Sequence, residues 1–171
     1  MYLLGDSRPA APLLQEGLAI FRGRGDREGI GCTLGALGYV AIALGDLGRA
    51  MTCFRESLAV LRDLGDKRGI AWCLAGFGAV AVATERRLEQ DTDGRAARLL
   101  GAAEAIHGSL DIPWLPLYRR DFDQAVATLR ARQPETAFTA AWTEGKAMTL
   151  EQAIAYAISY ESASISIHTD K

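Results

Sequence analysis

The chain repeats itself with a period of 40 residues. Residues 14–31, LQEGLAIFRGRGDREGIG, align with residues 54–71, FRESLAVLRDLGDKRGIA. The matching pairs are Glu16 and Glu56, Leu18 and Leu58, Arg22 and Arg62, Gly25 and Gly65, Asp26 and Asp66, and Ile30 and Ile70. A fixed period of this length is typical of proteins in which one structural unit is copied and stacked.

Apolar residues within the repeat follow the spacing of a helix. In residues 48–64 they recur every three or four positions and form one stripe: Ala50, Met51, Phe54, Leu58, Leu61 and Leu64. Gly65-Asp66 ends this helix, and residues 67–84 form a second helix that is rich in alanine and glycine. A helical hairpin of this length cannot bury its own apolar face. We therefore expect an all-α solenoid of antiparallel helical hairpins.

Residues 31–58 resemble the tetratricopeptide repeat. The resemblance is carried by Leu34, Leu37-Gly38, Gly45-Asp46, Ala50, Phe54 and Ser57, and the first helix recurs at Leu74, Phe77-Gly78, Ala81 and Ala83. The period is longer than the usual unit of that family, which implies its extended variety with longer helices. We expect such repeats, about 40 residues each, over residues 1–112, with the first repeat incomplete.

The repeat register places the start of the chain inside a repeat. Gly5-Asp6 stands where Gly45-Asp46 stands in the next copy, and only four residues precede it. We therefore expect the first helix to lack its hairpin partner, which indicates that the chain is a fragment or starts late. The alternative is a short natural chain that self-associates through its open N-terminal end. The apolar face that this would expose contains Leu14, Leu18 and Phe21.

Two prolines, Pro113 and Pro116, end the repeat array because proline cannot continue a helix. Residues 118–132 and 134–148 then show helical stripes, and Thr149 with Gln152 can form a capping box for a last helix. We expect residues 113–160 to form capping helices and residues 161–171 to form a disordered tail. The side chains expected to face inward on the last helix are Ala153, Ile154, Ala157 and Ile158.

Residues 96–158 carry a second resemblance. The segments ARLLGAAEAIHGSL, YRRDFDQAVATLRA and AFTAAWTEGKAMTLEQAIAYAI are similar to the extreme C-terminal end of large bacterial regulators, LuxR-type and winged-helix activators among them. Those proteins join a DNA-binding or cyclase head to a signal-transduction ATPase and a tetratricopeptide sensor. The resemblance implies an interaction or effector-sensing module in transcription regulation, with the ATPase and the DNA-reading helices upstream.

Patterns that would indicate catalysis or a metal are missing from the sequence. There is no GxxxxGK[ST] phosphate loop, and the glycine-rich residues 23–29 miss GxGxxG by one position. His107 and His168 are not part of an HExxH pattern. The sequence therefore indicates no enzyme, no cofactor and no metal site.

Cysteine usage, charge and hydropathy indicate the cellular location of the chain and limit its classes of partner. The three cysteines, Cys32, Cys53 and Cys73, form no CxxC pair and suit buried packing in a reducing cytosol. The chain has 19 basic and 21 acidic residues, so it lacks the excess of positive charge that is typical of nucleic-acid-binding proteins. No run of about 18 apolar residues occurs. We expect a cytoplasmic protein that binds neither nucleic acid nor a membrane directly.

The concave groove of the repeats is the remaining candidate site. Members of the family that bind peptide carboxylates use Lys, Asn and Arg there, whereas these positions are apolar and aromatic. We expect a protein or peptide partner such as a hydrophobic helix, a small apolar effector, or the upstream ATPase domain as its occupant. Two alternatives stay open: side chains that only pack between helices, and a free-standing tetratricopeptide scaffold. The groove positions are Cys32, Tyr39, Ile42, Trp72, Ala79 and Val82.

Overall fold

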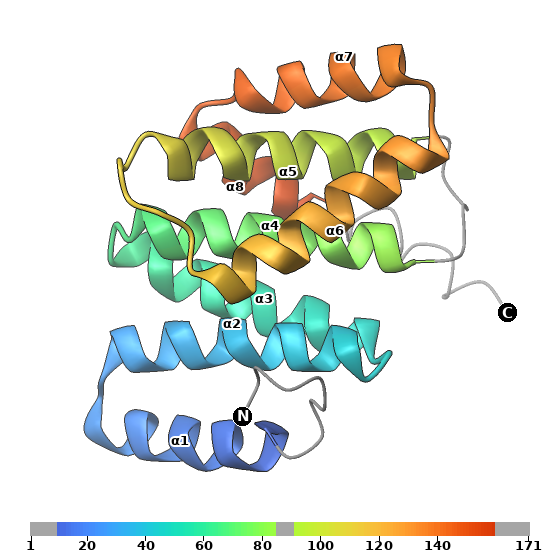
Figure 1. The fold of residues 1–171 in the computed structure, drawn as a ribbon. Coiled ribbons are helices and arrows are strands. Elements are labelled where there is room, and N and C mark those ends of the chain that lie inside the picture. The colour runs from blue at the N-terminus through green and yellow to red at the C-terminus, as the bar shows by residue number, and fades with distance from the viewer. Residues whose placement is uncertain (1–9, 85–90, 160–171) are drawn as a thin grey trace, which may run out of the picture.

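The computed structural model describes residues 10–84 and 91–159. These residues form eight α-helices and no strand, which confirms the expected all-α class (Figure 1). The match of Gly5-Asp6, the expected tail over residues 161–171, and His168 lie outside the described residues. The helices are α1 (Ala10–Arg24), α2 (Arg27–Ala43), α3 (Leu47–Asp63), α4 (Lys67–Ala83), α5 (Thr92–Gly108), α6 (Pro116–Arg132), α7 (Glu135–Lys146) and α8 (Leu150–Ile158).

The same Gly-Asp turn joins α1 to α2, α2 to α3, and α3 to α4. Its glycine has a positive φ of 66° at Gly25, 78° at Gly45 and 68° at Gly65, a conformation that other residues rarely adopt. Each following aspartate caps the next helix by accepting a hydrogen bond from the backbone N–H three residues on. The 40-residue repeat is therefore made of two 20-residue units, each a helix and a turn.

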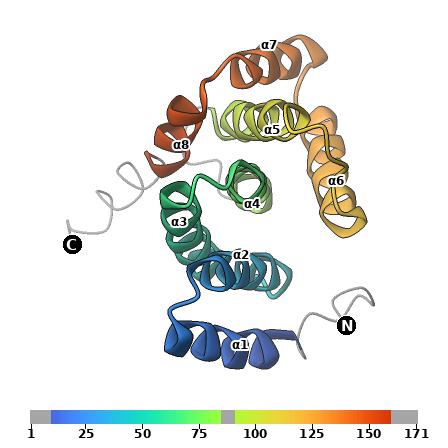
Figure 2. The ribbon, with the colours of Figure 1, turned by 90° about the vertical axis from the view of Figure 1, so that its left-hand side faces the viewer.

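Helices α1 to α5 pack on one another in chain order, and α7 packs on the far side of α5 (Figures 1 and 2). Helix α2 also contacts α4. Helix α6 does not join this stack but crosses its side against α4 and α5, while α8 lies on the opposite side (Figure 2). The crossing position of α6 shapes the candidate site.

The glycines of α2 and α4 make room for rings from neighbouring helices. The ring of Phe54 on α3 is fully buried and lies against both Gly38 of α2 and Gly76 of α4. A Cβ atom added to Gly38 would lie 2.7 Å from that ring, closer than side chains tolerate. The small residues that the sequence places in these helices thus let the helices close around Phe54.

Two polar side chains in the core, Ser57 and Cys73, are paired with each other. The Ser57 hydroxyl donates to the backbone oxygen of Gly31 at 2.7 Å, and the Cys73 thiol lies 3.2 Å from the same hydroxyl. Burial raises the pKa of the Cys73 thiol to about 12. Cys53 is also buried and Cys32 is half-buried, and all three are free thiols. Packing of Cys53 and Cys73 in the core agrees with the sequence-based interpretation.

The expected exposure of Leu18 is wrong, and Leu14 and Phe21 are only partly exposed. Leu18 is buried and Leu14 packs beside it against side chains of α2 and α3, while the ring of Phe21 lies against Gly29 at the start of α2. The reason is that α1 docks on α2 across the Gly25-Asp26 turn. The large apolar side chains that α1 does expose are Leu13 and Ile20, at 59% and 50%.

The last helix begins as expected. The Thr149 backbone N–H donates to the Gln152 side chain at 2.9 Å, and the Gln152 backbone N–H donates to the Thr149 hydroxyl at 3.2 Å. This is the predicted capping box. Ala153, Ile154 and Ala157 face inward, but Ile158 is exposed because it lies at the end of the helix, past the core.

Candidate functional site

Three aromatic rings, from α2, α4 and α6, meet where the start of α6 lies against α4. The rings of Tyr39 on α2 and Trp72 on α4 stack with centroids 5.4 Å apart and planes 11° apart. Tyr118, in the first turn of α6, places its ring centroid 4.5 Å from that of Trp72 and 6.2 Å from that of Tyr39. The Tyr118 side chain therefore covers the part of the predicted groove that Tyr39 and Trp72 line.

Local sequence explains why the tryptophan lies flat at this point. Its six-membered ring rests on Gly35 of α2, where an added Cβ atom would come within 2.5 Å of the indole. The Tyr39 hydroxyl donates to the backbone oxygen of Trp72 at 3.1 Å and fixes the pair. Trp72 is only 7% exposed and Tyr39 8%. Both side chains belong to the core as well as to the site.

Helix α6 divides the predicted groove into two hollows. The first, which we call the aromatic hollow, has a volume of about 310 Å³ and is lined by Cys32, Asp66, Arg68, Gly69, Trp72, His107, Ile112, Pro113, Trp114, Leu115 and Tyr118. The second measures about 490 Å³ and contains Tyr39, Ile42, Ala79 and Val82, together with polar side chains of α6. The six predicted groove residues thus lie in two places, Cys32 and Trp72 in one and the other four in the second.

The aromatic side chains of the hollow come from four parts of the chain. His107 of α5 stacks on Trp114 of the α5–α6 linker, with ring centroids 4.0 Å apart and planes 14° apart. Trp72 comes from α4, and Tyr118 from α6. Trp114 and Tyr118 are half-buried, so parts of their rings are open to a ligand. Stacking surfaces of this kind suit a planar molecule.

Two charged residues lie at the N-terminal end of α4, beside the rings. The Asp66 carboxylate accepts a hydrogen bond from the Gly69 backbone N–H at 3.0 Å and so caps the helix. Arg68 is exposed and, within the described part of the chain, its side chain forms no ion pair or hydrogen bond. The hollow therefore has one uncommitted cation and one anion that is already engaged.

The imidazole, the thiol and the phenol in the walls have pKa values shifted toward their neutral forms. Burial lowers the pKa of His107, and the nearby cations Arg68 and Arg119 lower it further, while Glu104 opposes them. Burial also raises the pKa of the Cys32 thiol and of the Tyr118 phenol. At neutral pH the positive charge of Arg68 is left without a thiolate or phenolate to offset it.

Sequence reasoning missed most of these walls. Arg68, His107, Trp114 and Tyr118 were not among the predicted site residues, and two signals could have indicated them. The linker DIPWLPLY places a tryptophan and a tyrosine beside prolines, and the repeat register aligns Arg68 with Glu28, which reverses the charge. The position of α6 was needed to bring them together.

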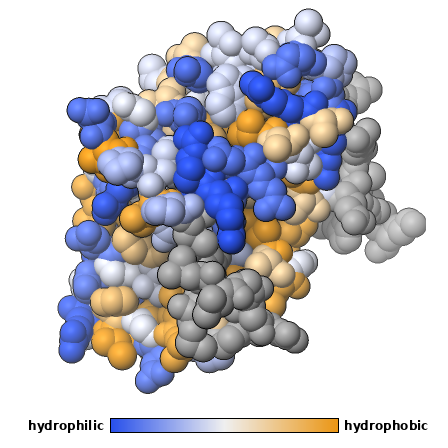
Figure 3. All heavy atoms as spheres, viewed as in Figure 1, coloured by the Kyte–Doolittle hydropathy of each residue, from blue (hydrophilic) through white to orange (hydrophobic). Residues whose placement is uncertain are grey.

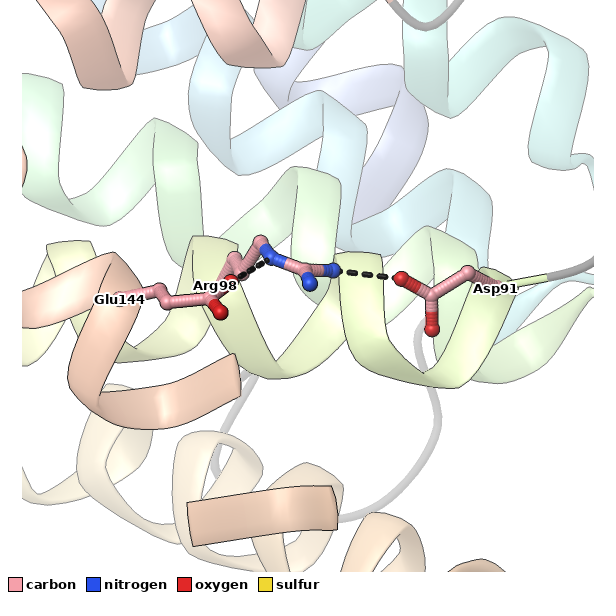
Figure 4. Close-up of polar contacts among 3 residues, drawn as sticks. All are labelled: Asp91, Arg98 and Glu144. Carbon is pink, nitrogen blue, oxygen red and sulfur yellow. Dashed lines mark hydrogen bonds and ion pairs between the residues drawn. The ribbon is translucent and has the colours of Figure 1, made fainter. Parts of the chain in front are cut away.

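The segment AAWTEGKAM docks α7 on α5. Arg98 of α5 donates to Glu144 of α7 and to Asp91, each at 2.6 Å (Figure 4). Burial lowers the pKa of Arg98, but these two hydrogen bonds outweigh it and raise the pKa overall. Gly145 lies against the backbone of Arg98, where a Cβ atom would clash. This part of the resemblance to regulators therefore has a structural role here.

The outer side of α6 is polar. Figure 3 shows strongly hydrophilic side chains over the part of the molecule that α6 covers in Figure 1. Several of them form exposed ion pairs, such as Arg119 with Asp123 at 2.9 Å. Exposed pairs of this kind contribute little to stability. The inner side, with Tyr118, Phe122 and Leu129, is what holds α6 in place.

Across residues 10–84 and 91–159, no group of three or more His, Cys, Asp or Glu side chains is placed to hold a metal ion. In those ranges, too, every helix is too short or too polar to cross a bilayer.

Comparisons of the chain with protein-family models, with curated proteins and with solved structures found no match. A functional assignment therefore depends on the residues and their arrangement.

Proposed function

We propose that the chain is a non-catalytic interaction and effector-sensing module, built of tetratricopeptide-like hairpins at the C-terminal end of a bacterial transcriptional regulator. The observation that carries the binding function is the aromatic hollow of about 310 Å³ between α2, α4, α5 and α6. A concave site with aromatic walls and few polar groups is typical of a ligand site.

The helix arrangement supports the tetratricopeptide-like part of the proposal. In the repeat that the sequence resembles, the first helix of each unit lines the inner surface; here those helices are α2 and α4, and they contact each other. Residues that carry the resemblance pack together, since Phe54 of α3 lies against Gly38 of α2. The aromatic hollow opens on this α2–α4 side.

The chemistry of the walls favours binding over catalysis. Cys32 and His107 both line the aromatic hollow, a residue pair that some enzymes use for nucleophilic attack. That use requires a lowered thiol pKa, whereas burial and the nearby carboxylates of Asp66 and Glu28 raise the pKa of Cys32. A protonated, half-buried thiol can contact a ligand but is a poor nucleophile.

Titration of the isotope-labelled chain with indole, a neutral and planar probe, tests the binding function. We expect the largest changes in backbone amide chemical shift at Cys32, Trp72, Trp114 and Tyr118, together with changes at the side-chain N–H of the two tryptophans. The reason is that a planar apolar probe should enter the hollow that these residues line. Shifts confined to the exposed α1 residues Leu13 and Ile20, or absent at millimolar indole, would contradict the proposal.

The link to a transcriptional regulator rests on the resemblance of residues 96–158 and has its own test. The DNA upstream of the Met1 codon should encode a signal-transduction ATPase in the same reading frame. A promoter and a ribosome-binding site directly before that codon would contradict the link and favour the free-standing scaffold.

A further inference from the structure

We propose that the aromatic hollow selects planar aromatic carboxylates of one or two rings, with Arg68 pairing with the carboxylate. This inference rests on the proposed binding function and adds the chemical class of the ligand. Three features of the hollow lead to it: its rings, its charge and its size.

The rings define the planar part of the ligand. Trp114 and Tyr118 are half-buried and line the hollow, and each packs against a further ring. The His107 ring stacks on Trp114, and the Trp72 ring lies 4.5 Å from that of Tyr118 between centroids. Because these rings are held by their neighbours, a planar ligand can stack on them without first ordering the walls.

The charge defines the polar end of the ligand. Arg68 forms no ion pair with a described residue, while Asp66 is tied to the N-terminus of α4. Among the other charged groups nearby, Glu104 faces Arg119, 3.5 Å away. The guanidinium of Arg68 can form two parallel hydrogen bonds with a carboxylate, which a neutral amide cannot match.

The size excludes a large occupant. A volume of about 310 Å³ stands at the lower end of the range for ligand sites, which begins at roughly 300 Å³. A helix, which with its side chains is about 10–12 Å across, is too large for this volume. One or two fused rings with a carboxylate meet all three conditions.

Calorimetric titration of the chain with 2-naphthoate and with its neutral analogue 2-naphthamide tests the inference. We expect naphthoate to bind about tenfold more tightly than naphthamide, since charge-assisted hydrogen bonds are worth roughly this factor. Arg68→Gln should remove the difference by weakening naphthoate alone. Arg62→Gln, which removes an exposed arginine of α3 outside the hollow, is the matched control and should change neither affinity.

A second variant tests the rings. Trp114→Leu keeps an apolar side chain but removes the stacking surface, so it should weaken naphthoate and naphthamide to a similar extent. Circular dichroism of each variant checks that the helices remain formed. Naphthoate binding that survives both Arg68→Gln and Trp114→Leu would place the ligand elsewhere and overturn the inference.

The outcomes separate the two proposals. If indole maps to the hollow but naphthoate binds no more tightly than naphthamide, the carboxylate preference is wrong and the binding function stands. If neither indole nor naphthoate binds at millimolar concentration, both proposals fail.

Discussion

Trp72 is enclosed by residues from two other helices, α2 and α6. Gly35 lies under its six-membered ring, Tyr39 stacks on one side, and Tyr118 reaches it from α6. Its exposed fraction of 7% is that of a core residue. At the residue scale, the side chain that the sequence indicates as a ligand anchor is also a structural support of the site.

Trp72→Ala should therefore lower the free energy of unfolding by about 3–5 kcal/mol, as removal of a buried tryptophan commonly does. Gly38→Leu should cost about 1–3 kcal/mol, because its side chain would collide with the ring of Phe54. Urea unfolding followed by circular dichroism measures both. A Trp72→Ala variant as stable as the wild type would show that the indole is not packed as described.

At the scale of elements, two glycines decide how α7 meets α5. Gly145 of α7 lies against the backbone of Arg98, and Gly101 of α5 lies against the backbone of Trp142. Backbone atoms cannot move aside as a flexible side chain can. The close contact of α5 and α7 depends on these two positions having no Cβ atom.

Gly145→Ala should thus destabilise the chain by about 1–3 kcal/mol, although alanine favours helices. Gly17 of α1 is the matched control, since nothing lies within 4 Å of its missing Cβ atom. Gly17→Ala should stabilise the chain by up to about 1 kcal/mol. Thermal unfolding of the two variants measures the contrast, and two shifts of the same sign would speak against the α5–α7 contact.

Local patterns were sufficient to predict most helix boundaries. Gly-Asp turns, apolar stripes and the Thr149–Gln152 capping box are all encoded within a few residues, and the structure shows each of them. The buried face of α1 was misjudged because the repeat register alone does not tell which neighbour a helix packs on. Leu18 has its partners on α2 and α3, across the turn.

At the scale of the whole molecule, the path of α6 was beyond local patterns. The sequence indicates a helix after Pro116 but not that it leaves the stack and crosses α4 and α5 while α7 takes the place beside α5. That choice depends on long-range contacts, such as Tyr118 with Trp72 and Gly145 with Arg98. The aromatic hollow could not be predicted for the same reason, because its walls meet only once α6 is in place.

The account as a whole depends on α6 lying against α4 with Tyr118 beside Trp72 and Tyr39, since this contact forms the aromatic hollow. Nuclear Overhauser effects between ring protons test it most directly in the protein without ligand. We predict cross-peaks from Tyr118 to Trp72 and weaker ones to Tyr39, because the ring centroids are 4.5 and 6.2 Å apart. Cross-peaks between Tyr39 and Trp72 without any to Tyr118 would show that α6 lies elsewhere and that the hollow does not exist.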